Sequence, residues 1–239
     1  MSTRVRTAML MAAGLGTRMR PLTNDRPKPL VQVAGQALID HALDRIEAGG
    51  IERVVVNVHY LPDQVEAHLQ ARRTGMEILI SDERDELLET GGGLMKAAPL
   101  LGDAPFLCAN SDNIWTDTGQ DSISMLSGLW DDDRMDALLL LVPRERATCH
   151  GGPGDFHLGE DGRLSRCAPD ATAPYVFTGV QIMSPRLLRA PPGPAFSTNI
   201  FWNRALDAGR LYGAVHQGLW FDVGTPEAIP VVEASLVHG

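Results

Sequence analysis

The chain has 239 residues, of which 44% are hydrophobic and 21% are charged, and these values fit a globular protein with one large α/β domain. Its 21 Lys and Arg residues are outnumbered by 30 Asp and Glu residues, which gives a formal net charge of -9. Because a nucleic-acid-binding surface needs clustered cations to neutralise phosphates, this balance argues against a DNA- or RNA-binding role.

Short, continuously apolar runs alternate with helical patterns through the first 142 residues. The predicted strands are 5–11, 54–58, 76–80, 106–109 and 137–142, and the predicted helices are 37–48, 63–72, 92–101 and 123–130. Continuous apolar strands separated by helices are typical of a parallel sheet that is covered on both faces. We therefore predict a doubly wound α/β core.

The second half changes character. A Glu-Asp-Gly turn at 160–162 separates two short runs and predicts a hairpin. The predicted strands are 155–158, 163–167, 175–183, 211–216 and 219–223, and the predicted helices are 198–208 and 226–237. No internal repeat or long linker interrupts the chain, so we expect residues 1–239 to form a single domain with a mixed β extension after the parallel core.

Three features bear on location. Cys108, Cys149 and Cys167 are too scattered for a disulfide framework or a CxxC metal motif. No apolar run approaches the roughly 18 residues that a membrane span requires, and no targeting signal is visible. We expect a cytoplasmic protein with reduced thiols that does not associate with a membrane.

A glycine-rich loop follows the first strand directly. Gly14 and Gly16 stand where open α/β sheets bind phosphates, and glycine lets backbone N–H groups approach a polyphosphate. A Rossmann fingerprint would need a glycine in place of Met19, and the Gly-Lys-Ser/Thr triplet of a P-loop is absent. The flanking Pro27 and Pro29 stiffen the backbone around Lys28 and fix a positive charge near this loop.

These segments resemble the signature of the sugar-1-phosphate nucleotidyltransferases. The matching blocks occur in order at 12–23 (AAGLGTRMRPLT), 26–31 (RPKPLV), 89–93 (ETGGG), 110–112 (NSD), 177–179 (FTG) and 222–225 (DVGT). The resemblance implies a glycosyltransferase-A-like fold, which is a Rossmann-like, doubly wound mixed sheet, without the C-terminal β-helix of some relatives. It also implies a nucleotide-binding core in 1–142 and sugar-binding and closing elements in 143–239.

The family's reaction is Mg²⁺-dependent: a sugar 1-phosphate attacks the α-phosphate of a nucleoside triphosphate and pyrophosphate leaves. The match to the short bacterial branch favours UTP and N-acetylmuramate 1-phosphate, as used in peptidoglycan recycling. Guanylyl transfer to a mannose or heptose phosphate, cytidylyl transfer to phosphocholine, and a catalytically silent nucleotide-sugar-binding relative stay open. Retention of Arg18, Lys28, Asp112 and Asp222 argues against the silent relative.

Displacement at an α-phosphate joins two polyanions, so it needs cations and positioning rather than covalent catalysis. Arg18 and Lys28 are the expected catalytic cations. Since Mg²⁺ prefers carboxylate oxygens, we expect Asp112 and the distant Asp222 to share one ion. The structural alternative for Asp222 is a buried cap on the following Gly-Thr-Pro turn. Ser111 stands where the family commonly has glycine, and its hydroxyl could tighten the metal site or bond a ligand.

The remaining expected contacts are to the substrates. By resemblance, the ETGGG block contacts the nucleobase, with its amides facing the ligand, and the segment at 177–179 lines the sugar pocket. The expected substrate-binding residues are Ala12, Ala13, Gly14, Gly16, Thr17, Glu89, Thr90, Gly91, Gly92, Asn110, Asp155, Thr178 and Gly179.

Overall fold

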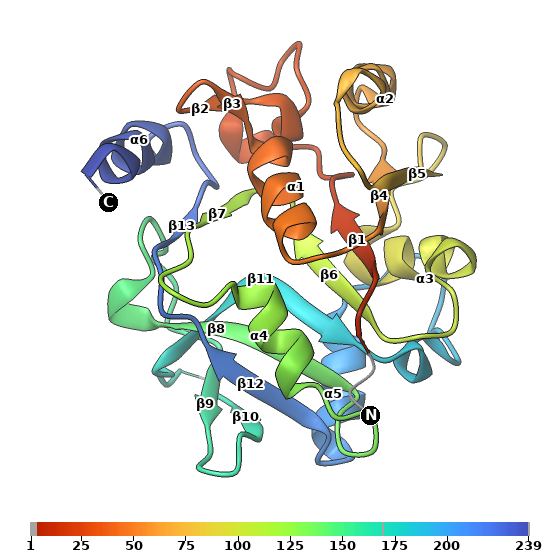
Figure 1. Cartoon of the computed structure of the whole chain (residues 1–239), viewed down its shortest axis with the longest axis vertical. Coiled ribbons are helices and arrows are strands. Elements are labelled where there is room, and N and C mark those ends of the chain that lie inside the picture. Colours follow the sequence, from red (N-terminus) through yellow and green to blue (C-terminus); the bar gives the residue numbers. More distant parts are fainter. Residues whose placement is uncertain (1–3, 169, 239) are drawn as a thin grey trace.

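The computed structural model describes residues 4–168 and 170–238, and within them nine strands form one mixed sheet. Four strands of the first half are parallel neighbours in the spatial order β5 (Glu77–Asp82), β4 (Arg53–Val58), β1 (Thr7–Met11) and β6 (Phe106–Asn110). The predicted parallel core is confirmed for these four strands, whereas the fifth predicted strand, 137–142, lies elsewhere in the sheet (Figure 1).

The second half extends this sheet with mixed strand directions. β11 (Tyr175–Met183) lies antiparallel beside β6, and β8 (Ala137–Pro143) pairs with the other edge of β11. The sheet is completed by β12 (Leu211–Val215), parallel to β8, and by the hairpin of β9 (Phe156–Leu158) and β10 (Leu164–Arg166). The unbroken aliphatic run of β8 therefore reports burial on both faces rather than a place beside β6.

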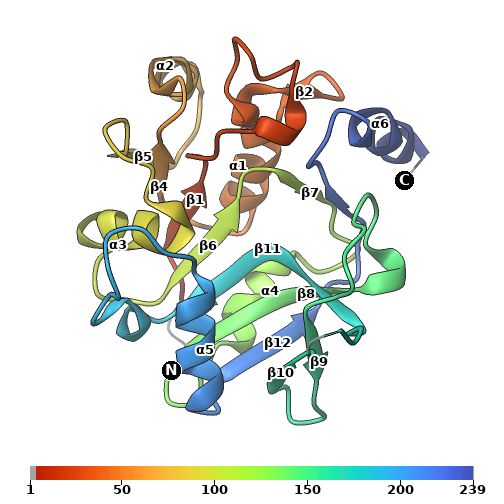
Figure 2. The same ribbon diagram turned by 180° about the vertical axis from the view of Figure 1, so that it is seen from behind.

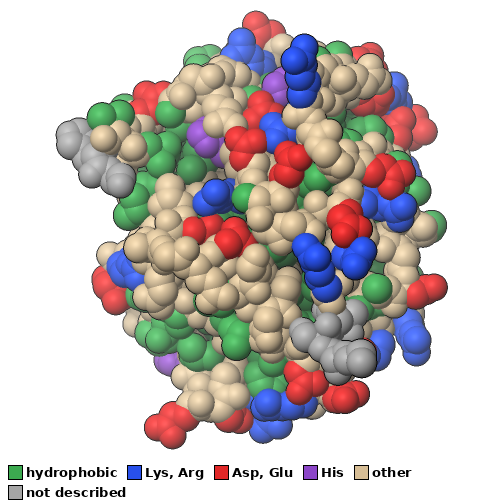
Figure 3. Space-filling view, viewed as in Figure 1, with side chains coloured by type: hydrophobic (Ala, Val, Ile, Leu, Met, Phe, Trp, Pro, Cys, Tyr) green, Lys and Arg blue, Asp and Glu red, His purple; other side chains and the backbone are tan. Residues whose placement is uncertain are grey.

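Helices cover both faces of the sheet. α1 (Leu38–Ala48) and α4 (Ser122–Leu129) lie on one face, and α3 (Glu89–Leu101) and α5 (Asn199–Asp207) lie on the other (Figures 1 and 2). Along β1, Leu10 belongs to the core under α1, and Met9 belongs to the core under α3. Acidic and basic side chains are interspersed over α1 and over α2 (Pro62–Ala71) on the outer surface (Figure 3).

A third, smaller hydrophobic cluster lies beneath the loops at the carboxyl ends of the parallel strands. Its buried members, here called the loop core, are Met19, Val31, Val33, Leu38, Ile114, Phe221, Val223, Ala228 and Val232. They come from the following elements: η1 (Thr17–Met19), β2 (Gln32–Val33), α1, β7 (Asn113–Trp115), β13 (Trp220–Asp222) and α6 (Ala228–His238), together with the loops beside them and η2 (Lys28–Leu30). Loops and strands far apart in sequence are thereby fixed to one another.

All the predicted helices and strands are present, with ends shifted by a few residues at most. α3 begins at Glu89, before the predicted start at 92. The prediction missed β2, β3 (Gln36–Ala37) and β7, because two- and three-residue strands carry almost no periodicity, whereas β13 lies within the strand predicted at 219–223. Among the described residues, no helix combines the length and apolarity needed to cross a membrane. Cys108, Cys149 and Cys167 are free thiols.

Candidate active site

Two adjoining cavities open at the carboxyl ends of the parallel strands. The larger, of about 460 Å³, is lined by Met11, Ala12, Ala13, Gly14, Lys28, Pro29, Asn57, Leu87, Glu89, Thr90, Asn110, Ser111, Asp112 and Ser197. The smaller, of about 200 Å³, is lined by Arg18, Asn110, Asp112, Asn113, His150, Phe177, Gly179, Trp220 and Asp222. Asn110 and Asp112 belong to both linings, so the two cavities meet at the end of β6.

Lys28 is held at this meeting point. Its Nζ donates to Oδ2 of Asp112 at 2.6 Å, and the residue is only 9% exposed. Gly16 lies directly behind it: φ is +62°, and a Cβ there would approach Lys28 Cβ to 2.8 Å. Gly16 therefore makes room for the lysine, and neither it nor the exposed Thr17 is among the residues that line the cavities. Direct contact with a ligand stays a prediction for these two residues.

Arg18 and Asp222 both lie beside Gly224, at the position that a side chain there would occupy. A Cβ on Gly224 would stand 3.2 Å from Nη1 of Arg18 and 3.3 Å from Oδ1 of Asp222. Both side chains line the smaller cavity, and Arg18 is exposed. A bulkier residue at 224 would push the guanidinium and the carboxylate, so this glycine keeps the cationic edge of the cavity open.

Asp112 and Asp222 are brought together by the β7–β13 pair. Asp222 stands opposite Asn113, and the Val223 N–H donates to the Asp112 carbonyl at 3.1 Å. Both aspartates line the smaller cavity, where Nδ1 of His150 lies 3.6 Å from Oδ2 of Asp222. Within the described residues no group of three or more His, Cys, Asp and Glu side chains forms a metal cage. Two carboxylates fit Mg²⁺, which retains waters and takes further oxygen ligands from phosphates.

The Ser111 hydroxyl is engaged by the backbone at the end of β1. Its Oγ donates to the Met11 carbonyl at 2.8 Å, and its N–H donates to the same oxygen at 3.2 Å. The serine thus ties the end of β6 to the end of β1, so the extra side chain tightens the junction that carries Asp112.

A buried polar chain supports the start of the glycine loop. Asn57 Oδ1 accepts from the Ala12 N–H at 2.7 Å, and its Nδ2 donates to Oε1 of Glu83 at 2.8 Å. Glu83 is fully buried, its Oε2 has no hydrogen-bond partner among the described residues, and burial raises the pKa of this carboxyl. Asn57 was not predicted as a site residue, although a polar residue near the carboxyl end of a buried strand is typical of a site at that edge of the sheet.

The ETGGG block divides into two parts. Glu89 and Thr90 line the larger cavity. The N–H groups of Gly91 and Gly92 both donate to the Phe196 carbonyl, at 2.7 and 3.2 Å, and so do not face a ligand as expected. A Cβ on Gly92 would collide with the Pro194 carbonyl oxygen. These glycines are needed because another segment of the chain packs against them.

Of the residues expected around the sugar, one lines a cavity and two are engaged in hydrogen bonds within the fold. Gly179, with φ +86°, lines the smaller cavity, and a Cβ there would collide with Asn113 Oδ1. Thr178 is fully buried, and its hydroxyl donates to the Leu140 carbonyl at 2.9 Å. Asp155 accepts from the Phe177 N–H at 2.8 Å. Thr178 and Asp155 therefore anchor β11 and its neighbours, and contact with substrate stays a prediction for both.

Known proteins match both the sequence and the fold. The model of the nucleotidyl transferase family matches residues 7–152. An N-acetylmuramate α-1-phosphate uridylyltransferase of Caulobacter vibrioides is 46% identical over the full length of both chains. An enzyme of the same name from Neisseria meningitidis is 36% identical over 91% of this chain and 93% of its own.

Among solved structures, the inositol-1-phosphate CTP transferase of T. maritima superimposes with a TM-score of 0.80 over 99% of this chain and 97% of its own, at 19% identity. At that identity the likeness concerns the fold alone, and it agrees with the predicted mixed sheet. The family match over residues 7–152 and the two relatives that match over nearly the whole chain lead to one conclusion: the chain belongs to the nucleotidyl transferase family.

Proposed function

We propose that this protein transfers the uridylyl group of UTP to N-acetylmuramate 1-phosphate, giving UDP-N-acetylmuramate and pyrophosphate. The observation that carries the proposal is the Lys28–Asp112 pair at the junction of two cavities. A group-transfer enzyme with two phosphorylated substrates needs two adjoining pockets and, where the reacting phosphates meet, charged groups that lower their repulsion. The Caulobacter and Neisseria relatives support the choice of base and sugar.

The proposal places one substrate in each of the two cavities. The triphosphate would lie in the larger one, with its phosphates against Gly14 and Lys28 and its base toward Leu87 and Thr90. The sugar 1-phosphate would enter the smaller one, beside Arg18. In this arrangement both reacting phosphates reach Asp112, which lines both cavities.

In the proposed reaction, a phosphate oxygen of the sugar 1-phosphate forms a bond to the α-phosphorus as the bond from that phosphorus to the bridging oxygen breaks. Pyrophosphate leaves with that electron pair. Lys28 and Arg18 hold positive charge beside the two phosphates and lower their mutual repulsion. Asp112 and Asp222 would hold a Mg²⁺ ion, whose chemistry here is to neutralise phosphate charge. Gly14 leaves the entry to the loop open, since nothing stands within 4 Å of a Cβ built there.

Pyrophosphate release tests this proposal directly. Purified protein is mixed with Mg²⁺, with each of UTP, GTP, CTP, dTTP and ATP, and with a panel of sugar 1-phosphates. We expect UTP with N-acetylmuramate 1-phosphate to give the highest kcat/KM. A preference for GTP of more than about tenfold, roughly 1.4 kcal/mol in transition-state binding, would instead assign guanylyl transfer. No release with any pair would favour the catalytically silent relative. We further propose that the protein acts in the cytoplasm, where its three cysteines stay reduced.

A further inference from the structure

One lining residue of the larger cavity comes from far along the chain. Ser197 lies between β11 and α5, yet it shares the cavity with Leu87 and Thr90 at the start of α3. It belongs to the segment 194–198, here called the strap, which crosses the N-terminal end of α3 (Figure 2). Neither the glycine loop nor any of the blocks of the family resemblance includes this segment.

The backbone of the strap makes four hydrogen bonds to the start of α3. Phe196 accepts from the N–H groups of Gly91 and Gly92 and donates to the Leu88 carbonyl, at 2.7 to 3.3 Å. The Thr198 N–H donates to Oγ1 of Thr90 at 2.9 Å. Gly91 and Gly92 permit this contact, because a Cβ on either would lie within 2.7 Å of a strap atom. The run of glycines and the strap therefore fit as two complementary surfaces.

The strap is also anchored from the other side. The Phe196 ring is buried and stacks edge to face on Phe201 of α5, with centroids 5.4 Å apart. Just before the strap, the Arg204 guanidinium donates to the Arg189 and Ala190 carbonyls at 2.7 and 2.6 Å. With both ends fixed, Ser197 is presented to the cavity by a preformed wall, and little ordering is needed when a ligand binds.

We propose that the strap is one wall of the nucleobase pocket and that Ser197 is a specificity-determining residue that donates its hydroxyl proton to the base. This inference rests on the proposed function, which directs the phosphates to Lys28 and the base to the α3 end of the cavity. Ser197 Oγ accepts from the Asn199 N–H at 3.2 Å, which turns its own proton away from that N–H. With one lone pair occupied, the hydroxyl keeps its proton for the cavity, and donating it to a carbonyl oxygen suits uracil, which has a carbonyl where cytosine has an amino group; we therefore expect uracil to be preferred.

Binding measurements on the whole protein test the wall without relying on turnover. Titration calorimetry with UTP and Mg²⁺ compares Ser197→Asp with Ser165→Asp, a matched control because Ser165 is exposed on β10. We expect Ser197→Asp to weaken UTP binding at least tenfold by placing a carboxylate in the pocket, and Ser165→Asp to stay within twofold of the parent. Equal binding by both variants would overturn the proposal.

A second pair of variants moves the strap instead of its serine. Gly92→Ala places a Cβ against the Pro194 carbonyl and should lift the strap, whereas Gly128→Ala in α4 meets nothing within 4 Å. We expect the KM for UTP to rise at least tenfold in Gly92→Ala with little change in the KM for the sugar phosphate, and neither to change in Gly128→Ala. A cooperatively unfolding Gly92→Ala protein with an unchanged KM for UTP would contradict the wall. Should this variant not fold, the Ser197 pair decides alone.

The variant Ser197→Ala tests whether the Ser197 hydroxyl discriminates between uracil and cytosine. We expect its preference for UTP over CTP, measured as the ratio of dissociation constants, to fall at least fivefold. An unchanged ratio would overturn the specificity role. If the parent protein binds GTP rather than UTP, the uridylyl assignment is wrong, and the same Ser197→Asp comparison with GTP then decides whether the strap walls the pocket.

Discussion

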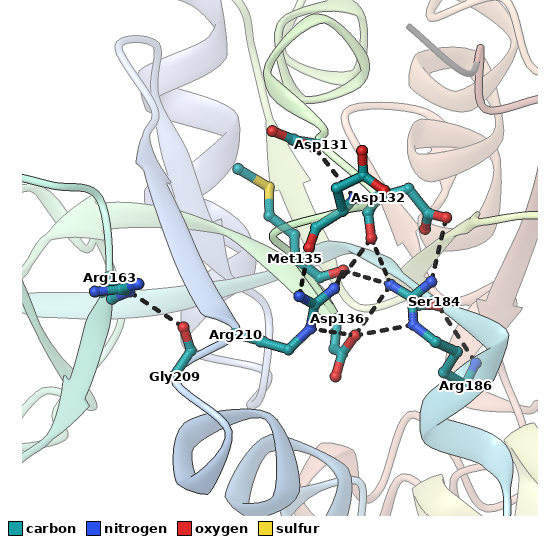
Figure 4. A network of polar contacts seen from close by, with 10 residues as sticks. Asp131, Asp132, Met135, Asp136, Arg163, Ser184, Arg186, Gly209 and Arg210 are labelled. Atoms are coloured by element: carbon teal, nitrogen blue, oxygen red, sulfur yellow. Dashed lines mark hydrogen bonds and ion pairs between the residues drawn. The ribbon is translucent and has the colours of Figure 1, made fainter.

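Two clusters of charged side chains in this molecule use their charges in opposite ways. In the first, Arg186 and Arg210 share the Asp136 carboxylate, with N–O distances of 3.1 and 2.9 Å (Figure 4). The remaining nitrogens of the two guanidinium groups donate to the Asp132, Asp133 and Met135 carbonyls and to the Asp132 carboxylate. In the second, the Lys28 ammonium bonds to Asp112 and faces the junction of two cavities.

The difference lies in how many hydrogen-bonding positions are already filled. Each guanidinium nitrogen of Arg186 and Arg210 has a partner within the chain, so this cluster ties the segment before β8 to η4 (Pro185–Leu188) and to the start of β12. An ammonium has three N–H donors, and one bond to Asp112 leaves Lys28 with donors for a phosphate. A charged group whose donors are all bonded within the chain stabilises the fold, whereas a charged group with free donors at a cavity can bind a ligand.

The largest effect is expected at Lys28. Lys28→Ala should lower kcat by about a thousandfold, roughly 4 kcal/mol in the barrier, because a charged contact to the reacting phosphates is lost. Pyrophosphate release measures it. The chain offers a matched control in Lys96, which is exposed on α3, and Lys96→Ala should keep the parent rate. Near-normal turnover by Lys28→Ala would remove this lysine from the mechanism.

The second-largest effect is expected at Asp222, and it tests whether this carboxylate binds a metal or stabilises the fold. Asp222→Asn should lower turnover about a hundredfold and raise the Mg²⁺ concentration for half-maximal rate, because an amide is a weaker metal ligand than a carboxylate. Thermal unfolding without metal should barely change. A variant that melts several degrees lower with an unchanged Mg²⁺ requirement would instead make Asp222 a structural cap of the turn that precedes α6.

The cluster of Asp136, Arg186 and Arg210 should affect stability and not activity. Asp136→Ala leaves two arginines without their shared carboxylate, whose side chain is 14% exposed, and should cost about 2–3 kcal/mol of unfolding free energy. For a chain of this length, that lowers Tm by roughly 5–10 °C. The KM values at 25 °C should be unchanged. The control is Asp161→Ala, whose pair with Arg163 is more than half exposed, and its Tm should fall by less than about 2 °C.

The smallest effect concerns the buried Glu83. Burial raises the pKa of its carboxyl above the usual 4.5, so the folded protein keeps this proton to a higher pH than the unfolded chain does. The stabilisation from this group is therefore complete below pH 4.5 and is lost as pH rises through the raised pKa. Glu83→Gln removes this dependence.

Urea unfolding of the parent and Glu83→Gln at about pH 4.5 and about pH 7.5 measures the difference. We expect the free energy of unfolding of the parent, relative to the variant, to decrease as pH rises. Glu86→Gln serves as the control, because Glu86 is an exposed carboxylate close to Glu83 in the sequence. A parent that gains stability relative to Glu83→Gln over this range would show that Glu83 is stabilised as a carboxylate.

The sequence was informative wherever a signal was local. Apolar periodicity located the helices and strands of the sheet, and the glycine loop with Lys28 between two prolines indicated a phosphate site. Asn110, Asp112 and Gly14 could be placed at the cavity because parallel strands end at one edge of the sheet. The pattern was misleading for Gly91 and Gly92, since a glycine suits a ligand and a packed neighbour equally well.

The sequence by itself determined the helices, most of the strands and the family, because these depend on residues near one another in the chain. Only the tertiary structure decided which distant segments meet. Asp222 reaches the loop that carries Asp112 through the β7–β13 pair, and Ser197 comes to line the same cavity as Thr90 because the strap packs on Gly91 and Gly92. Such contacts depend on the loop core and on complementary surfaces formed by several segments at once, and no single stretch of sequence carries that information.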